Sequence, residues 1–281
     1  MIRRECINFL FIGPDKTGST WLYSLLSRHP DVYVPTAKDL YYFDRYYHKG
    51  DEWYLSFFPK YEGQYVAIGE LSHDYIFSQQ AAKRIFSFNP NMKLLCTLRD
   101  PIDRTFSHYL NLKRNGHTKK PLRAAVLEYP ELIDHSLYAN HLSTYLELFG
   151  SQQLELLKFS NLLSSPKAFA QDVYRFLSLI DQEVLDLDIK RMPASRPRSY
   201  LLAKIAKKGA NLIRDLGYPQ MVGKVKYCKL AGLLYEPYAK DKKPWLSNDD
   251  ILWLTDIFRE DVYKVGKLFS LAAPEWTTHD Y

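Results

Sequence analysis

The feature that most constrains this chain is a glycine loop between a buried strand and a helix. Residues 7–12 are a continuous apolar run that ends at Gly13, and apolar residues at helical spacing follow from Ser19. The loop between them, "GPDKTGST", contains a second glycine, Lys16 and two hydroxyl residues. Backbone N–H groups at the start of a helix attract anions, and a lysine adds a full positive charge. The segment therefore predicts a phosphate-binding loop.

The position of the lysine separates this loop from the common nucleotide-binding pattern G-x-x-x-x-G-K-[ST]. In that pattern lysine follows the second glycine. Here Lys16 lies between Gly13 and Gly18, and Ser19 and Thr20 follow directly. No apolar run ends in a clear magnesium-holding aspartate, which an ATP-using enzyme of this type needs. The loop alone leaves open a kinase, another anion, or a glycine-rich turn without a ligand.

Strand-like and helix-like segments alternate along the first two thirds of the chain. The strand-like runs are 7–12, 66–69, 93–98 and 154–159; the helix-like segments start at Ser19 and cover 79–88, about 103–114, 137–149 and 166–179. The last third is helical in pattern, over 200–216 and from a capping box at Ser247 to about residue 269. This alternation predicts an α/β fold, with a P-loop-type parallel sheet flanked by helices on both faces and a helical C-terminal third. The absence of linkers or repeats favours one domain over residues 1–281.

A second segment, "KLLCTLRDPIDRTFSHYL", suits a second phosphate. It places Arg99 at the carboxyl end of a predicted strand and Ser107 on the helix that follows. Ligands of parallel sheets bind beyond the carboxyl ends of the strands. Arginine offers a planar fork of donors for a phosphate, and serine offers a hydroxyl. An arginine at a helix terminus and a surface serine would explain the same residues without a ligand.

Together the two segments resemble the sulfotransferases that use 3′-phosphoadenosine-5′-phosphosulfate (PAPS). "KTGST" is similar to their 5′-phosphosulfate loop, K-[ST]-G-[ST]-[ST], in which lysine precedes the glycine. "RDPIDRTFSHY" is similar to their 3′-phosphate motif, R-x-P-x-x-R-x-x-S-x-Y. "HPDVYVPTAKDLYYFD", "GELSHDY" and "SRPRSY" extend the resemblance to heparan-sulfate-type members and their bacterial relatives. It implies that these residues bind PAPS without a metal: Lys16, Thr17, Gly18, Ser19, Thr20, Arg99, Ser107, Arg196 and Arg198.

The resemblance also implies an acid–base group for the acceptor. The family has a glutamate before an aromatic pair, in a K-E-x-x-F-F pattern, and "KDLYYF" places Asp39 there, one methylene shorter. Glu70, at the end of a predicted strand, is the rival, although an ion pair with a lysine would also explain it. The family often has a lysine after this glutamate, where this chain has Leu71. Lys38 and His73 are the candidates to supply that charge. Lys16 is expected to stabilise the leaving phosphate.

The sequence indicates the class of acceptor and of binding partners, but not their identity. Between residues 41 and 65, 11 of 25 residues are aromatic. Most are expected to pack in the core, but some could line a carbohydrate acceptor cleft. The net charge of +6 is uneven, with 13 Lys/Arg against three acidic residues from 191 to 243. We expect a cytoplasmic enzyme with a hydroxyl or amine acceptor on a glycan or glycolipid.

Two rival functions fit parts of the sequence. A P-loop kinase for a small molecule would bind ATP with magnesium. A non-catalytic module would bind an anionic membrane or polyanion through residues 191–243. The chain has no nucleic-acid recognition motif.

Overall fold

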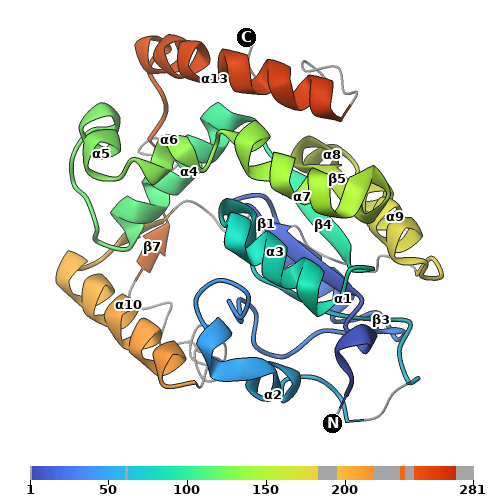
Figure 1. The fold of residues 1–281 in the computed structure, drawn as a ribbon. Helices are drawn as coiled ribbons and strands as arrows, with labels where there is room; N and C mark the ends of the chain where they lie inside the picture. The colour runs from blue at the N-terminus through green and yellow to red at the C-terminus, as the bar shows by residue number, and fades with distance from the viewer. Residues whose placement is uncertain (1, 61–62, 183–194, 218–234, 238–243, 270–281) are drawn as a thin grey trace.

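A five-stranded sheet is the centre of the computed structural model, which describes residues 2–60, 63–182, 195–217, 235–237 and 244–269 (Figure 1). Its order is β2-β3-β1-β4-β5, and every pairing in it is parallel. The strands are β1 (Phe9–Gly13), β2 (Val32–Tyr33), β3 (Ala67–Leu71), β4 (Lys93–Leu98) and β5 (Leu154–Lys158). The predicted α/β fold with a parallel sheet is confirmed. The two-residue strand β2 is too short to produce a sequence pattern.

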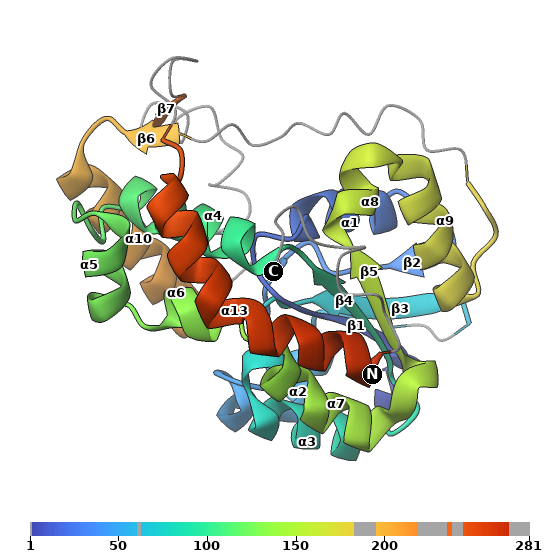
Figure 2. The ribbon, with the colours of Figure 1, turned by 90° about the horizontal axis from the view of Figure 1, so that it is seen from above.

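Helices cover both faces of the sheet (Figures 1 and 2). On one face lie α1 (Ser19–Leu26), α8 (Phe159–Ser164) and α9 (Pro166–Leu177). On the other face lie α3 (Gln79–Phe88), α4 (Pro101–Arg114), α7 (Tyr138–Gln153) and α13 (Asn248–Leu268). The remaining elements are α2 (Gly50–Leu55), α5 (Leu122–Glu128), α6 (Glu131–Asp134), α10 (Tyr200–Asp215), the antiparallel pair β6 (Ser195–Pro197) and β7 (Tyr235–Pro237), and 3-10 turns at Arg4–Cys6, Tyr47–Lys49 and Tyr75–Phe77.

Strand β1 explains why a parallel strand is apolar along its whole length. Phe9 and Phe11 pack with α1 and α9, whereas Leu10 and Ile12 pack with α3 and α7 on the opposite face. All four side chains are fully buried. Successive strand residues point to opposite faces, so a strand covered on both sides needs apolar residues at every position. This packing leaves the carboxyl ends of the strands as the edge at which loops can hold polar groups.

The helical C-terminal third has the predicted boundaries where the structure describes it. Ser247 caps α13 by accepting a hydrogen bond from the N–H of Asp250 at 3.1 Å.

In α7, which precedes the C-terminal third, helical geometry ends at Gly150, which has φ 68, so the predicted helix end near residue 149 is confirmed. No helix in the described ranges combines the length and the apolar character that crossing a membrane requires.

A buried ion pair fastens the loop after β1 to helix α4. Arg104 is fully buried, and its guanidinium donates to the Asp15 carboxylate at 2.7 Å. It also donates to the Ser136 hydroxyl at 2.6 Å and to the Leu132 carbonyl at 3.2 Å. Burial alone would raise the pKa of Asp15, but the charge of Arg104, with a contribution from Lys16, holds that pKa well below its usual value. The carboxylate is therefore ionised at neutral pH and at mildly acidic pH.

Replacing this carboxylate tests how strongly the loop depends on the pair. Asp15→Asn is expected to lower the free energy of unfolding by about 3 kcal/mol near neutral pH, because it leaves the Arg104 charge buried and unpaired. The pKa of Asp15 is lower in the folded state than in the unfolded state, where it is near 3.8. The ionised carboxylate therefore stabilises the fold at pH values above 3.8, and this stabilisation is lost as the pH falls through the folded-state pKa. The difference between the two proteins in urea denaturation should therefore shrink below about pH 4.

The matched control is Asp256→Asn, which removes an exposed aspartate paired with Arg259 at 3.1 Å. Exposed pairs of this kind contribute about 0.5 kcal/mol or less. Equal losses of unfolding free energy in the two variants would show that the buried Asp15–Arg104 pair stabilises the fold no more than an exposed pair does.

Candidate functional site

The loop after β1 presents an open helix start to one edge of the sheet. Lys16 and Gly18 have left-handed backbones, with φ 67 and φ 89, and α1 begins at Ser19. No side chain in the described part of the protein caps this helix. A Cβ at Gly18 would lie 2.5 Å from Leu162, so the turn requires glycine for space as well as conformation. Amide groups at such a helix start are donors for an anion.

The hydroxyl groups of Thr17 and Ser19 have different hydrogen-bond partners. The Thr17 side chain is buried and donates to the Pro14 carbonyl at 2.7 Å. Thr17 can therefore offer a ligand its backbone N–H but not its hydroxyl. Ser19, the first residue of α1, accepts a hydrogen bond from the Lys38 ammonium at 2.7 Å. Lys38 thus brings a second positive charge, besides Lys16, to the start of the helix.

The second predicted phosphate site lies beside this loop. Arg99 follows the last residue of β4, and its guanidinium donates to the Lys16 carbonyl at 3.3 Å. The same guanidinium lies over the Phe159 ring, 5.0 Å from its centroid. Its Nε atom is buried and has no hydrogen-bond partner in the described structure. The two segments that the sequence singled out, 83 residues apart, therefore meet at one place.

A pocket of about 320 Å³ opens on the Arg99 side of this contact, lined by residues after β4 and in α8 and by none of the loop after β1. Its lining residues are Arg99, Asp100, Asp103, Phe159, Ser160, Leu163 and Ser164. Phe159, the first residue of α8, contacts both ends of the site, because it lies under Arg99 and within 3.2 Å of a Cβ built at Gly18. Ser107 is half-buried about two turns along α4, on the same helix as Arg104. No sequence signal pointed to Phe159, since it is one apolar residue at a strand end.

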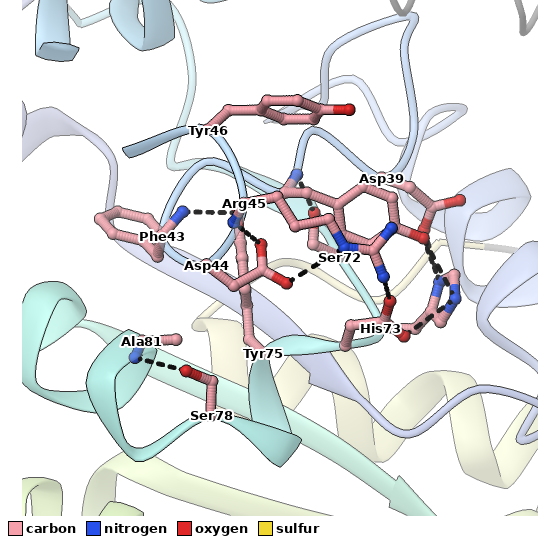
Figure 3. A network of polar contacts seen from close by, with 12 residues as sticks. Asp39, Phe43, Asp44, Arg45, Tyr46, Ser72, His73, Tyr75, Ser78 and Ala81 are labelled. Carbon is pink, nitrogen blue, oxygen red and sulfur yellow. Dashed lines mark hydrogen bonds and ion pairs between the residues drawn. The ribbon is translucent and has the colours of Figure 1, made fainter. Parts of the chain in front are cut away.

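The third part of the site is a carboxylate paired with an imidazole. Figure 3 shows Asp39 and His73 facing each other beyond the end of β3, with Arg45 nearby. The Asp39 carboxylate is 2.7 Å from Nδ1 of His73. Nε2 of the same ring is 3.3 Å from the Asp74 carboxylate and 3.2 Å from the Tyr41 hydroxyl. Burial alone would lower the pKa of His73, but the two carboxylates outweigh it and raise that pKa above its usual value.

Backbone geometry holds this pair next to the loop after β1. Asp39 has a left-handed backbone, φ 65, and its N–H donates to the Leu71 carbonyl at 2.9 Å. On the other side, a Cβ at Gly13 would lie 2.1 Å from the His73 carbonyl oxygen. Gly13 also has φ 124, so only glycine allows the loop and the His73 segment to approach this closely.

Glu70 occupies a different environment from Asp39. Its carboxyl is fully buried and accepts hydrogen bonds from the Tyr75 hydroxyl at 2.6 Å and the Ser72 hydroxyl at 2.8 Å. Burial outweighs these bonds and raises the pKa of Glu70 to about 8. The group is thus mostly protonated at neutral pH.

The remaining predicted residues lie farther along the chain. Arg198 is exposed, and Arg196 belongs to β6, whose backbone pairs with β7 and packs against α4. The side chain of Arg196 lies outside the described atoms. No cluster of three or more metal-ligating side chains occurs in the described ranges.

Sequence reasoning missed the structural link between the phosphate sites. Arg104 was matched as a motif residue, but its burial and its bond to Asp15 were not foreseen. A charged residue inside the apolar face of a predicted helix was the available signal, since such a residue must be paired.

Comparison with known proteins identifies the family. Residues 7–207 match the family model described as "Sulfotransferase domain". The mouse (Mus musculus) bifunctional heparan sulfate N-deacetylase/N-sulfotransferase 4 is 33% identical over 193 residues, which cover 61% of this chain and 22% of that protein. The chain therefore spans only about a fifth of this relative's length.

Solved structures share the fold. A sulfotransferase from Alicyclobacillus acidocaldarius superposes with a TM-score of 0.67 at 22% identity, covering 96% of this chain and 98% of the other. Mouse sulfotransferase SULT7A1, complexed with PAP, superposes with a TM-score of 0.54 at 13% identity, covering 96% and 89%. With a family match over residues 7–207, most of its length, this chain belongs to the sulfotransferase family.

Proposed function

We propose that this protein transfers a sulfuryl group from PAPS to a hydroxyl or amine of a carbohydrate-containing acceptor. The observation that carries the proposal is the hydrogen bond from Arg99 to the Lys16 carbonyl, at 3.3 Å. It supports one continuous site with a cationic group at each end, which suits a nucleotide that carries phosphates on both its 3′ and 5′ positions. A structural neighbour, mouse sulfotransferase SULT7A1, was solved in complex with PAP, the bisphosphate that the proposed transfer would leave.

The described residues suit this donor. The amides that begin α1, with Lys16 and Lys38, would hold the 5′-phosphosulfate, and Arg99 with Ser107 would hold the 3′-phosphate. The buried, unpaired Nε of Arg99 is an unused donor at that end. PAPS supplies an activated sulfuryl group whose transfer leaves adenosine 3′,5′-bisphosphate. Lys16 and the loop amides then face the negative charge that grows on the leaving phosphate, and they are already oriented before reaction.

Asp39 is the residue that we propose as the base. It accepts the proton of the attacking hydroxyl or amine, and the imidazolium of His73 keeps the carboxylate oriented at 2.7 Å. Both nitrogens of His73 face carboxylates, so the ring serves as a fixed cation rather than as the proton acceptor. Glu70 suits this role less well, because it is fully buried and its raised pKa keeps it mostly protonated near neutral pH.

A carbohydrate acceptor is supported by the surface that follows Asp39. Most aromatic side chains of this segment pack in the core, as expected, but Tyr47 stays partly exposed. It lines a pocket of about 400 Å³ whose other charged residues are Arg4, Lys49, Asp51 and Glu52. An aromatic face beside charged groups that can form hydrogen bonds suits the ring and hydroxyl groups of a sugar. The mouse relative is named for heparan sulfate, which is a glycan.

The donor is tested by calorimetric titration with adenosine 3′,5′-bisphosphate and, separately, with ATP and magnesium. Arg99→Ala is expected to weaken bisphosphate binding about 10- to 100-fold, because a hydrogen-bonded charge is lost. Arg175→Ala, at an exposed arginine paired with Asp172, is the control and should bind normally. Tighter binding of ATP with magnesium than of the bisphosphate would replace the proposal with a kinase.

The base is tested by turnover of labelled PAPS with a glycan acceptor. Asp39→Asn is expected to lower turnover about 10²- to 10⁴-fold while leaving bisphosphate affinity unchanged. Glu70→Gln, which keeps a neutral group of similar size at a carboxyl that is already protonated, should retain turnover within a few-fold. A larger loss in Glu70→Gln than in Asp39→Asn would move the role of base to Glu70.

The role of His73 is tested by the pH dependence of turnover. Because its pKa is raised above the usual value, the His73 ring carries a positive charge beside the proposed base on the acid side of the profile. His73→Gln removes that charge, so the acid midpoint should move up by about one pH unit. His48→Gln, at an exposed histidine, should leave the midpoint in place. An unchanged midpoint in His73→Gln would mean that the ring does not influence the base.

A further inference from the structure

Helix α10 exposes an unusual amount of aliphatic surface. Leu202, Ile205, Leu212 and Leu216, here called the apolar stripe, are 54%, 56%, 60% and 64% exposed. At 3.6 residues per turn their spacing puts them on one side of the helix. Isolated exposed leucines are ordinary, but several aligned on one helix mark an interaction surface. Figure 1 shows α10 at the periphery of the molecule, away from the central sheet.

The protein holds the end of α10 in place without covering the stripe. The Asp215 carboxylate accepts a hydrogen bond from the Tyr46 hydroxyl at 2.7 Å, and the Asp215 carbonyl accepts one from the Lys49 ammonium at 3.0 Å. A Cβ at Gly217 would meet Lys49 and Trp53 only at ordinary contact distances. The helix is therefore attached at its C-terminal turn, and the apolar stripe is exposed along the described part of α10.

Positively charged side chains lie next to the apolar stripe on α10. Lys204 and Lys208 are exposed on the neighbouring side of α10. The sequence around the helix, residues 191–243, carries 13 Lys/Arg against three acidic residues. A helix with an aliphatic side and a lysine-rich side is suited to lie in the plane of a membrane surface, where apolar residues enter the headgroup boundary and lysines meet anionic lipids.

We propose that α10 binds the surface of an anionic lipid bilayer through its apolar stripe, with Lys204 and Lys208 against the headgroups. A soluble polyanion would account for the lysines but would leave four exposed aliphatic residues without a partner. A second copy of the chain would cover the stripe, but a two-fold interface would bring the same positive charges together. The lipid surface satisfies both features, and the inference does not depend on the proposed sulfuryl transfer.

Binding of α10 to a bilayer would also place the segment that follows Asp39 near the lipid surface. Tyr46 and Lys49, which hold the end of α10, belong to the chain segment that follows Asp39. A protein docked through α10 would therefore hold this segment near the bilayer, where a glycolipid headgroup can approach.

The test is co-sedimentation of the full chain with vesicles of phosphatidylcholine, alone or with about 30% phosphatidylserine, at low and physiological salt. Wild-type protein is expected to bind the anionic vesicles and to bind neutral ones much more weakly. The double variant Ile205→Gln/Leu212→Gln, which keeps good helix formers, should bind anionic vesicles about tenfold or more weakly. Lys204→Gln/Lys208→Gln should weaken binding about fivefold to tenfold and make it less sensitive to salt.

The matched control is Leu127→Gln, at a residue of α5 that is 87% exposed and outside the stripe; it should bind like wild type. Each variant is also checked by light scattering and by titration with adenosine 3′,5′-bisphosphate, which should show no change. The proposal is overturned if wild-type protein does not co-sediment with anionic vesicles. It is equally overturned if Ile205→Gln/Leu212→Gln binds them normally, as a polyanion site would, or if that variant converts a dimer to a monomer, as a second copy would require.

Discussion

The buried bond between Arg104 and Asp15 is the interaction on which the rest of this site depends. A fully buried guanidinium has to be paired, and its partner here is a carboxylate in the loop after β1, the predicted phosphate loop. Helix α4 and the loop therefore cannot separate without exposing or orphaning a charge. Arg99 lies just before α4 and donates to the Lys16 carbonyl in the same loop. The ion pair and this hydrogen bond together tie the start of α4 to the loop after β1, which is the arrangement that the proposed donor site requires.

Two glycines complete this arrangement by allowing backbones to approach where side chains would not fit. Gly13 lies against the His73 carbonyl, and Gly18 lies against Leu162 on α8. As a result, the loops that leave β1, β3 and β5 lie close together at one edge of the sheet, and Arg99 at the end of β4 joins them. The proposed donor site and the carboxylate of Asp39 share this edge. Protonation of Glu70 avoids a further negative charge beneath that carboxylate.

The sequence was informative about the sheet and the motifs because both follow local rules. Continuous apolar runs predicted β1, β4 and β5, and the strand-to-helix context of the glycine loop predicted an anion site. The resemblance then connected that loop with Arg99. The sequence could not show that Thr17 turns its hydroxyl onto Pro14, or that His73 bonds to Asp39, because these depend on loop conformations with left-handed backbones at Lys16 and Asp39. Burial of Glu70 among hydroxyl groups likewise depends on tertiary packing.

The claim that one nucleotide spans the loop after β1 and Arg99 is tested most directly by a structure from crystals soaked with adenosine 3′,5′-bisphosphate. We predict one bound nucleotide, with its 5′-phosphate on the amides of residues 16–20 and the Lys16 ammonium, and its 3′-phosphate on Arg99 and Ser107. A nucleotide that contacts only one of these two groups, or that binds elsewhere with Lys16 and Arg99 facing separate cavities, would contradict the account.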